Sequence, residues 1–246
     1  MNKIQKAAIR TACLFIPVKK WRKQVRANIF SKDPTIETYK IFNYQGKELK
    51  LFQDSYNCGF YGKRMTERAI EMAVVKEWLK KIKENVTEVG AVTPYYFSSK
   101  KINDICDPYD PHKKVNNKCS MFDLDLTNKN VLSISTVEHI ASGDYGVKIN
   151  KNEDAVKGLE KIINESKNCL ISVPTGINKL LDDYFAKEKF KNIKLNDNSI
   201  LSVTLYERNA KDNNFKIQKD FKRANMLEYG PIAANGVLFI EKERKQ

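Results

Sequence analysis

The chain carries two spacings of apolar residues, one typical of strands and one typical of helices. Apolar and polar residues alternate on both sides of Gly46 across residues 36–53, which predicts a β-hairpin with this glycine in its turn. Across residues 66–83 and 153–166, apolar residues recur every three or four positions, which predicts two amphipathic helices.

Short apolar runs between and after these helices predict a set of β-strands. Strands that alternate with helices are typical of an α/β sheet with a parallel core. The side chains of Thr66 and Asn152 are good N-caps, so the two helices should begin beside them. The expected strands lie at residues 86–92, 102–107, 118–123, 130–136, 168–173, 199–206 and 236–241.

The beginning of the chain is basic and interrupts the α/β pattern. The apolar run ACLFIPV is too short for a membrane span and lacks an A-x-A cleavage site, so we expect it to be retained. The following KKWRKQVR predicts a basic helix, which could touch a membrane surface or simply be solvated. We therefore divide the chain into an extension, residues 1–65, with a basic helix and the hairpin, and a main domain, residues 66–246.

Charge and cysteine content narrow the class of protein. The 246 residues carry a formal net charge of +14, which fits either an anionic partner or a solvated lysine-rich surface. The five cysteines include no CxxC pair, which fits free thiols in a reducing, cytoplasmic setting. Cys106, His112 and Cys119 are close in sequence but lack a fourth ligand and zinc spacing, so no metal site is expected.

The turn in TEVGAVTPYYF bears most directly on the ligand. A dinucleotide-binding loop needs several glycines, but only Gly90 is present, and Val92 and Tyr95 stand where the others would be. Their side chains would obstruct a pyrophosphate, which makes an NAD-dependent oxidoreductase the least favoured reading. S-adenosylmethionine (SAM) has no pyrophosphate and escapes this restriction.

Several polar residues follow the predicted core strands. Asp107, in DICDPYD, could accept hydrogen bonds from ribose hydroxyls or serve only a β-turn. Asp123 or Asp125, in SMFDLDL, could accept from an adenine amino group or be a loop acid. Glu138 and His139 follow the strand in VLSISTVEHI, where a neutral histidine could take a proton from a hydroxyl or play a structural part.

The segments TERAIEMAVVKEWL, TEVGAVTPYY, ICDPYD, LSISTVEHI and LISVPTGIN together resemble class I SAM-dependent methyltransferases. The similarity covers residues 36–180 and is greatest to a branch from bacterial capsule and lipopolysaccharide biosynthesis. It implies a Rossmann-like sheet of seven mostly parallel strands, of which the last is antiparallel. It also implies SAM as the cofactor.

The resemblance also assigns roles to individual residues. It places Glu88 and Gly90 at the methionine part of SAM, Asp107 at the ribose and Asp123 near adenine. Related enzymes bind a divalent metal through E-x-x-E-H, but Ser135 replaces the first acid here, so no metal is expected. The implied cofactor contacts are Glu88, Gly90, Ala91, Asp107, Pro108, Tyr109, Asp123 and Ser135. The implied catalytic residues are Glu138 and His139, and the expected substrate contacts are Arg68, Asn178, Arg208 and Arg223.

These expectations combine into one function with several alternatives. We expect methyl transfer to a hydroxyl of a nucleotide-activated sugar or a related precursor of surface polysaccharide, with His139 as the base. A phosphoramidate or another small capsule modification is an alternative acceptor. An RNA methyltransferase would also explain the charge, but the N/D-P-P-Y/F motif is absent after the fourth strand, where STVEHI stands. A noncatalytic methyltransferase-like scaffold is the remaining alternative, and the oligomeric state is left open.

Overall fold

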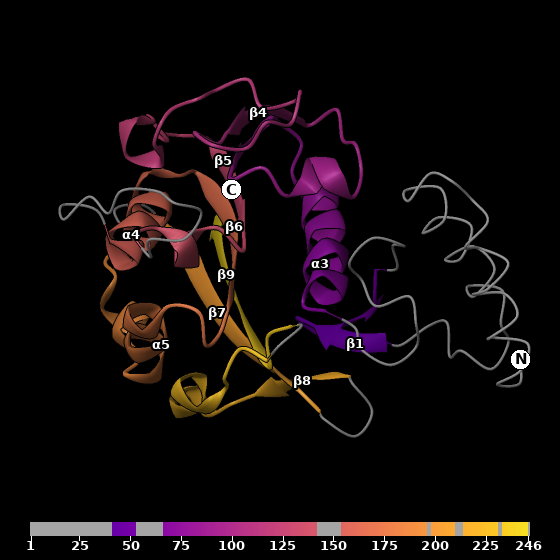
Figure 1. The fold of residues 1–246 in the computed structure, drawn as a ribbon, viewed down its shortest axis with the longest axis vertical. Coiled ribbons are helices and arrows are strands. Elements are labelled where there is room, and N and C mark those ends of the chain that lie inside the picture. Colours follow the sequence, from indigo (N-terminus) through magenta and orange to yellow (C-terminus); the bar gives the residue numbers. More distant parts are fainter. Residues whose placement is uncertain are drawn as a thin grey trace, which may run out of the picture.

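The fold is built around one large mixed β-sheet with helices on both of its faces (Figure 1). The computed structural model describes residues 41–52, 66–141, 154–195, 198–209, 214–230 and 233–245. None of the helices within these ranges combines the length and apolar character that crossing a bilayer requires. The predicted basic helix and the predicted boundary at residue 65 lie outside the described residues.

The strand order of the seven-stranded sheet is β4-β3-β5-β6-β9-β7-β8. The neighbours from β4 to β6 pair in parallel, whereas β9 is antiparallel to both β6 and β7, and β8 is antiparallel to β7. The last strand is therefore antiparallel, as expected, and lies between two strands that run the other way. The strands are β3 (Val86–Val89), β4 (Ile102–Cys106), β5 (Asn130–Ile134), β6 (Asn168–Pro174), β7 (Ser199–Arg208), β8 (Phe215–Gln218) and β9 (Gly236–Arg244).

Six of the seven predicted strands are present, with ends shifted by a few residues. The strand predicted at 118–123 is wrong, because Met121–Asp123 forms a 3-10 turn. The Ser120 side chain accepts a hydrogen bond from the Phe122 amide and so favours the turn. Strand β8 was not predicted; it completes the sheet by pairing with β7.

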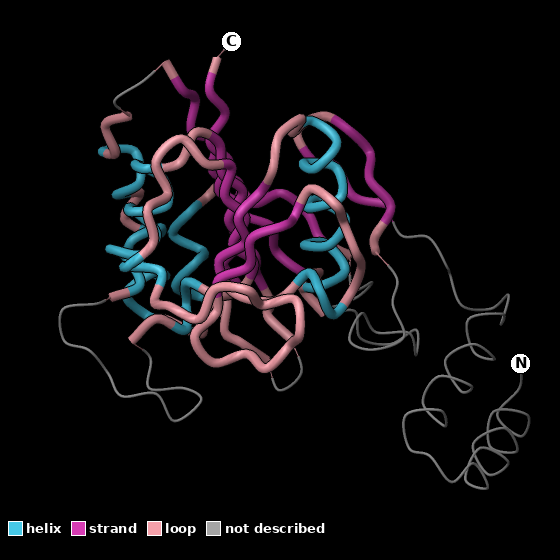
Figure 2. Tube along the Cα trace, turned by 90° about the horizontal axis from the view of Figure 1, so that it is seen from above, coloured by secondary structure: helices cyan, strands magenta, loops and turns pink. Residues whose placement is uncertain are grey.

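Helices cover the two faces of the sheet unequally (Figure 2). Helix α3 (Arg68–Lys81) packs on one face, while α4 (Ala155–Glu165) and α5 (Lys179–Ala186) pack on the other. The links from β3 to β4 and from β4 to β5 contain only the short 3-10 turns Thr93–Tyr95 and Met121–Asp123. No α-helix therefore lies between β3 and β4 or between β4 and β5, in links whose residues are all described.

The starts of the helices differ in part from prediction. Helix α3 has Glu67 rather than Thr66 at its N-cap position, and the Glu67 carboxylate instead accepts a hydrogen bond from the Ala234 amide. Helix α4 is capped by Asp154, which accepts from the Lys157 amide at 2.7 Å. The cap expected for α4, Asn152, lies outside the described residues. Helix α5 was not predicted.

The predicted hairpin is confirmed as β1 (Ile41–Tyr44) and β2 (Lys47–Lys50). Its two turn residues, Gln45 and Gly46, both have positive φ, as tight two-residue hairpin turns require. The hairpin joins the core beside α3: the Tyr44 hydroxyl donates to Glu241 at 2.6 Å. Buried rings on this face then form edge-to-face pairs across Phe42, Tyr44, Tyr206 and Phe239.

Candidate functional site

Two pockets lie at opposite ends of the parallel strands. The carboxyl-end pocket, of about 480 Å³, lies where β5 and β6 end and α3 begins. The amino-end pocket, of about 380 Å³, lies where β3 and β5 begin. Ligands of open α/β sheets bind at the carboxyl ends of strands. The carboxyl-end pocket is lined by Glu67, Arg68, Ser135, Glu138, His139, Pro174, Ile177 and Tyr229.

The most unusual group in the carboxyl-end pocket is the carboxyl of Glu138. The residue is completely buried, and among the described residues neither carboxyl oxygen has a hydrogen-bond partner. The nearby imidazole of His139 places Nε2 at 3.7 Å from Glu138 Oε1. Burial raises the pKa of Glu138 well above its ordinary value, and the charge of Glu71 raises it further. An unpartnered buried carboxyl beside an imidazole is a candidate for proton transfer or ligand binding.

The position of Glu138 is set by the chain segment that follows β5 and by a contact with the start of α5. Ser135 turns the backbone with a φ of 41°, and Val137 is fully buried in the core. The Asn178 side chain donates from Nδ2 to the Glu138 carbonyl at 3.0 Å. Asn178 Oδ1 also accepts from the Leu180 and Leu181 amides as the cap of α5. Asn178, expected at the substrate, therefore positions the acid through its backbone.

Arg68, also expected at the substrate, lines the pocket but is engaged by a buried acid of its own helix. Its guanidinium forms an ion pair with Glu71, which is completely buried. The other oxygen of Glu71 accepts from the hydroxyls of Ser135, at 2.6 Å, and Ser172, at 2.7 Å. The surrounding carboxylates outweigh desolvation and raise the pKa of Arg68, so its charge is permanent. Ser135, expected at the cofactor, serves this network.

A second buried acid, Glu67, closes the pocket on the side of the last strand. It accepts hydrogen bonds from the Tyr229 hydroxyl at 3.2 Å and from the Ala234 amide at 3.0 Å. Burial raises the pKa of Glu67, and the neighbouring charge of Glu71 adds to this effect. These contacts tie the start of α3 to the segment before β9.

The turn after β3 is held largely by the chain itself. Glu88 Oε1 accepts from the Val92 amide at 3.0 Å and from the Thr93 amide at 2.8 Å, while Oε2 accepts from the Thr93 hydroxyl. Burial nevertheless raises the pKa of Glu88 to about 7. Gly90 has a φ of +85°, and a Cβ there would lie 2.0 Å from the Thr136 hydroxyl oxygen. Both residues therefore have structural reasons for their identity.

Asp107 joins the ends of β3 and β4. Its Oδ1 accepts from the Tyr109 amide at 2.9 Å and the Asp110 amide at 2.8 Å, and its Oδ2 accepts from the Ala91 amide at 3.2 Å. A carboxylate has about four acceptor positions, so about one remains on Oδ2. Pro108 and Tyr109 are exposed beside it.

The other predicted contacts lie in different surroundings. Asp123 is exposed in its 3-10 turn. The Arg208 guanidinium donates to the Ala234 carbonyl at 2.7 Å and lies over the Phe215 ring. Arg223 is bound to Glu207 of β7. Each arginine expected at a substrate phosphate thus has a partner within the chain.

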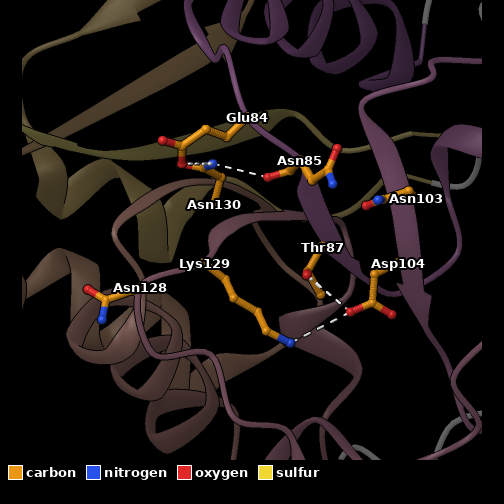
Figure 3. A pocket seen from close by; sticks show the side chains of 8 residues that line it. All are labelled: Glu84, Asn85, Thr87, Asn103, Asp104, Asn128, Lys129 and Asn130. Atoms are coloured by element: carbon orange, nitrogen blue, oxygen red, sulfur yellow. Dashed lines mark hydrogen bonds and ion pairs between the residues drawn. The ribbon is translucent and has the colours of Figure 1, made fainter.

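Several polar side chains in the amino-end pocket, including both of its acids, are bound by their neighbours (Figure 3). The Thr87 hydroxyl donates to Asp104 at 3.2 Å, and Lys129 lies 3.7 Å from the same carboxylate. The Asn130 amide donates to Glu84 at 3.4 Å and to the Asn85 carbonyl at 3.0 Å. These contacts join the beginnings of the neighbouring strands, so we interpret the amino-end pocket as structural.

Cys106 and Cys119 are close in space, but His112 is used elsewhere. The two sulfur atoms lie 3.6 Å apart, and the Cys106 thiol also lies 3.1 Å from the Cys119 carbonyl. His112 packs against the Tyr95 ring and accepts from the Lys114 amide. Within the described ranges, no group of three His, Cys, Asp or Glu side chains is placed to hold a metal ion.

Sequence reasoning missed the buried acid Glu71 and the pocket residues Glu67 and Tyr229. A signal for the two acids was present: they are four positions apart, so they share one face of a helix whose inward positions are mostly apolar. Comparison with protein-family models, curated proteins and solved structures gives no significant match to this chain.

Proposed function

We propose that this chain is a SAM-dependent methyltransferase with a Rossmann-like sheet. The observation that carries the proposal is the mixed sheet of seven strands, whose last strand is antiparallel, as the resemblance implies. The carboxyl-end pocket lies at the expected end of this sheet and contains Glu138 and His139.

The residues after β3 and β4 fit SAM in part. Asp107 keeps about one acceptor position for a ribose hydroxyl, and the exposed ring of Tyr109 lies two residues away. Glu88 does not fit a direct contact, because both of its oxygens already accept hydrogen bonds within the turn. When bound, SAM would supply a methyl group activated by its positively charged sulfur, ready for transfer to an acceptor oxygen.

His139 is the proposed base for the acceptor hydroxyl. Its imidazole lines the pocket, where it could take the hydroxyl proton. The adjacent carboxyl of Glu138 would stabilise the imidazolium that forms, since Oε1 lies 3.7 Å from Nε2. The acceptor is proposed to be a nucleotide-linked sugar or a related surface-polysaccharide precursor, made in the cytoplasm.

Calorimetry with SAM and with its demethylated product tests the donor site. We expect both to bind, and Asp107→Asn to weaken both by about ten-fold through loss of a charged acceptor. Incubation with SAM and a panel of nucleotide-linked sugars, followed by mass spectrometry, should then reveal one added methyl group. If neither SAM nor its demethylated product binds, the proposal is overturned.

A noncatalytic scaffold is the second candidate, and one observation favours it. Glu88 is satisfied within the chain, and Gly90 is explained by its packing against Thr136, so this turn needs no ligand to account for its sequence. The same calorimetry separates the two candidates, because a scaffold would bind neither SAM nor its product.

A further inference from the structure

The carboxyl-end pocket contains more acidic side chains than permanently charged basic ones. Of the described residues that line it, Glu67 and Glu138 bring carboxyls, and Arg68 brings the only permanent positive charge. That guanidinium already forms an ion pair with Glu71, which is buried beside the pocket. We propose that the pocket binds the protonated amino group of an amino sugar, with Glu138 as its direct partner.

Glu138 carries the proposal because it lacks what an amine supplies. Its two carboxyl oxygens are buried, and within the described chain no other residue donates a hydrogen bond to either of them. A buried carboxyl without hydrogen bonds from other residues bears a penalty of lost hydration, which a bound cation with N–H groups relieves. An ammonium group offers three such donors, whereas a hydroxyl offers one.

The pair formed by Glu138 and His139 leaves room for this ligand. Oε1 lies 3.7 Å from the imidazole Nε2, and the proposal assigns the amine to Oε2. A ring anchored there would hold a neighbouring hydroxyl close to the imidazole, because the two residues are adjacent in the 3-10 turn. This last step rests on the proposed methyl transfer, whereas amine binding itself does not.

A phosphate group does not suit this pocket. It would meet the acids Glu67 and Glu138, and Arg68 could bind it only by giving up part of its contact with Glu71. If the acceptor is a nucleotide-linked sugar, its diphosphate therefore lies outside the pocket and only its sugar enters.

The remaining walls match the body of a sugar ring. Pro174, Ile177 and Tyr229 supply apolar surface, and the Tyr229 hydroxyl is held by Glu67 at 3.2 Å. Aromatic and aliphatic walls with a few polar groups are typical of small-molecule pockets, and 480 Å³ lies within their usual range of about 300–1,000 Å³.

Ligand titrations followed by NMR test the proposal on the full chain at pH 6.5, where a sugar amine is protonated. The probes are D-glucosamine, N-acetyl-D-glucosamine, D-glucose and uridine diphosphate. We expect glucosamine to bind at least ten-fold more tightly than the acetylated or neutral sugar, and uridine diphosphate not to compete with it. Equal affinity for the three sugars, or displacement of glucosamine by uridine diphosphate, would overturn the proposal.

Two acid-to-amide variants locate the binding. Glu138→Gln should reduce the preference for glucosamine to less than three-fold, whereas Asp104→Asn in the amino-end pocket should preserve it. A preference that survives Glu138→Gln would remove this residue as the partner. SAM binding is measured on the same samples. If the protein binds SAM but shows no preference for the amine, only this inference is overturned. If it prefers the amine but does not bind SAM, only the proposed methyltransferase function is overturned.

Discussion

The amino-end and carboxyl-end pockets both contain acidic side chains, but the two pockets differ in whether these acids have hydrogen-bond partners. At the amino ends of the strands, Asp104 is bound by Thr87 and Lys129, and Asn130 is bound to the loop before β3. At the carboxyl ends, Glu138 is more deeply buried, and neither oxygen of its carboxyl has a hydrogen bond within the described chain.

The difference is between a pocket whose acids are bound by neighbouring groups and a pocket that holds an unsatisfied acid. Polar groups that satisfy one another stabilise a junction and leave little for a ligand to add. A buried carboxyl that nothing satisfies lowers stability, and such a cost is typical of sites where a ligand completes the contacts.

The largest expected effect is the loss of turnover in His139→Ala. Removing a general base should lower turnover by about 10²–10⁴-fold, while SAM affinity changes less than three-fold. The control is His112→Ala, which changes the other histidine of the chain, on the Tyr95 ring. Turnover is read as methyl gain by mass spectrometry. Equal turnover in the two variants would remove His139 from the mechanism.

The next effect concerns stability at the carboxyl ends. Gly90→Ala should lower the free energy of unfolding by about 2–4 kcal/mol, because positive φ strain adds to overlap with Thr136. Gly46→Ala is the matched control, since its φ is +80° but a Cβ there would meet nothing within 4 Å. It should cost only about 1–2 kcal/mol. Urea denaturation measures both, and equal losses would show that contact with Thr136 contributes nothing.

A smaller effect compares one acid from each pocket. Glu138→Gln should raise the free energy of unfolding by about 1–2 kcal/mol at pH 8, because a neutral amide is less costly to bury than a carboxylate. Asp104→Asn should lower it by less than about 1 kcal/mol, since its carboxylate is partly exposed and its ion pair is weak. A higher free energy of unfolding in Asp104→Asn, or a lower one in Glu138→Gln, would contradict the contrast between the pockets.

The gain from Glu138→Gln should also depend on pH. Burial raises the pKa of Glu138 above its ordinary value of 4.5, so the folded protein holds this proton more tightly than the unfolded chain. Wild-type stability is therefore lost as pH rises above about 5, and the advantage of the variant should grow from pH 5 to pH 8. Urea denaturation at several pH values measures the difference in free energy of unfolding between the variant and the wild type. A difference that shrinks as pH rises would contradict a raised pKa for Glu138.

The smallest expected effect is that of Glu88→Gln. The amide keeps the shape of the side chain, its oxygen can accept from both turn amides, and its nitrogen can donate to the Thr93 hydroxyl. We expect a change below about 1 kcal/mol near pH 5 and SAM affinity within three-fold of wild type. A ten-fold loss of SAM affinity at unchanged stability would instead place Glu88 in contact with SAM.

The same residue gives a second pH signature. Its pKa is raised to about 7 by burial, so its contribution to stability is present below pH 4.5 and is lost as pH approaches 7. Glu88→Gln should flatten this part of the stability curve.

The family resemblance implied the antiparallel direction of the last strand, and the sequence by itself determined the hairpin, helices α3 and α4 and six strands of the sheet. These follow from local rules: the spacing of apolar residues fixes which face of an element is buried, and Gly46 permits the tight turn. It also placed Glu138 and His139 after a core strand. It could not tell the strand at 118–123 from a turn, because a single serine cap there outweighs the apolar run.

Only the tertiary structure decided how the acids are used. Glu71 contacts Ser135 and Ser172, which are 64 and 101 positions away, and Glu67 contacts the segment before β9, so no local pattern reveals them. The same holds for Glu88, whose oxygens are taken up by its own turn, and for Glu138, whose oxygens are not. Whether a polar group is satisfied depends on what folding brings next to it, and the sequence records only that the group exists.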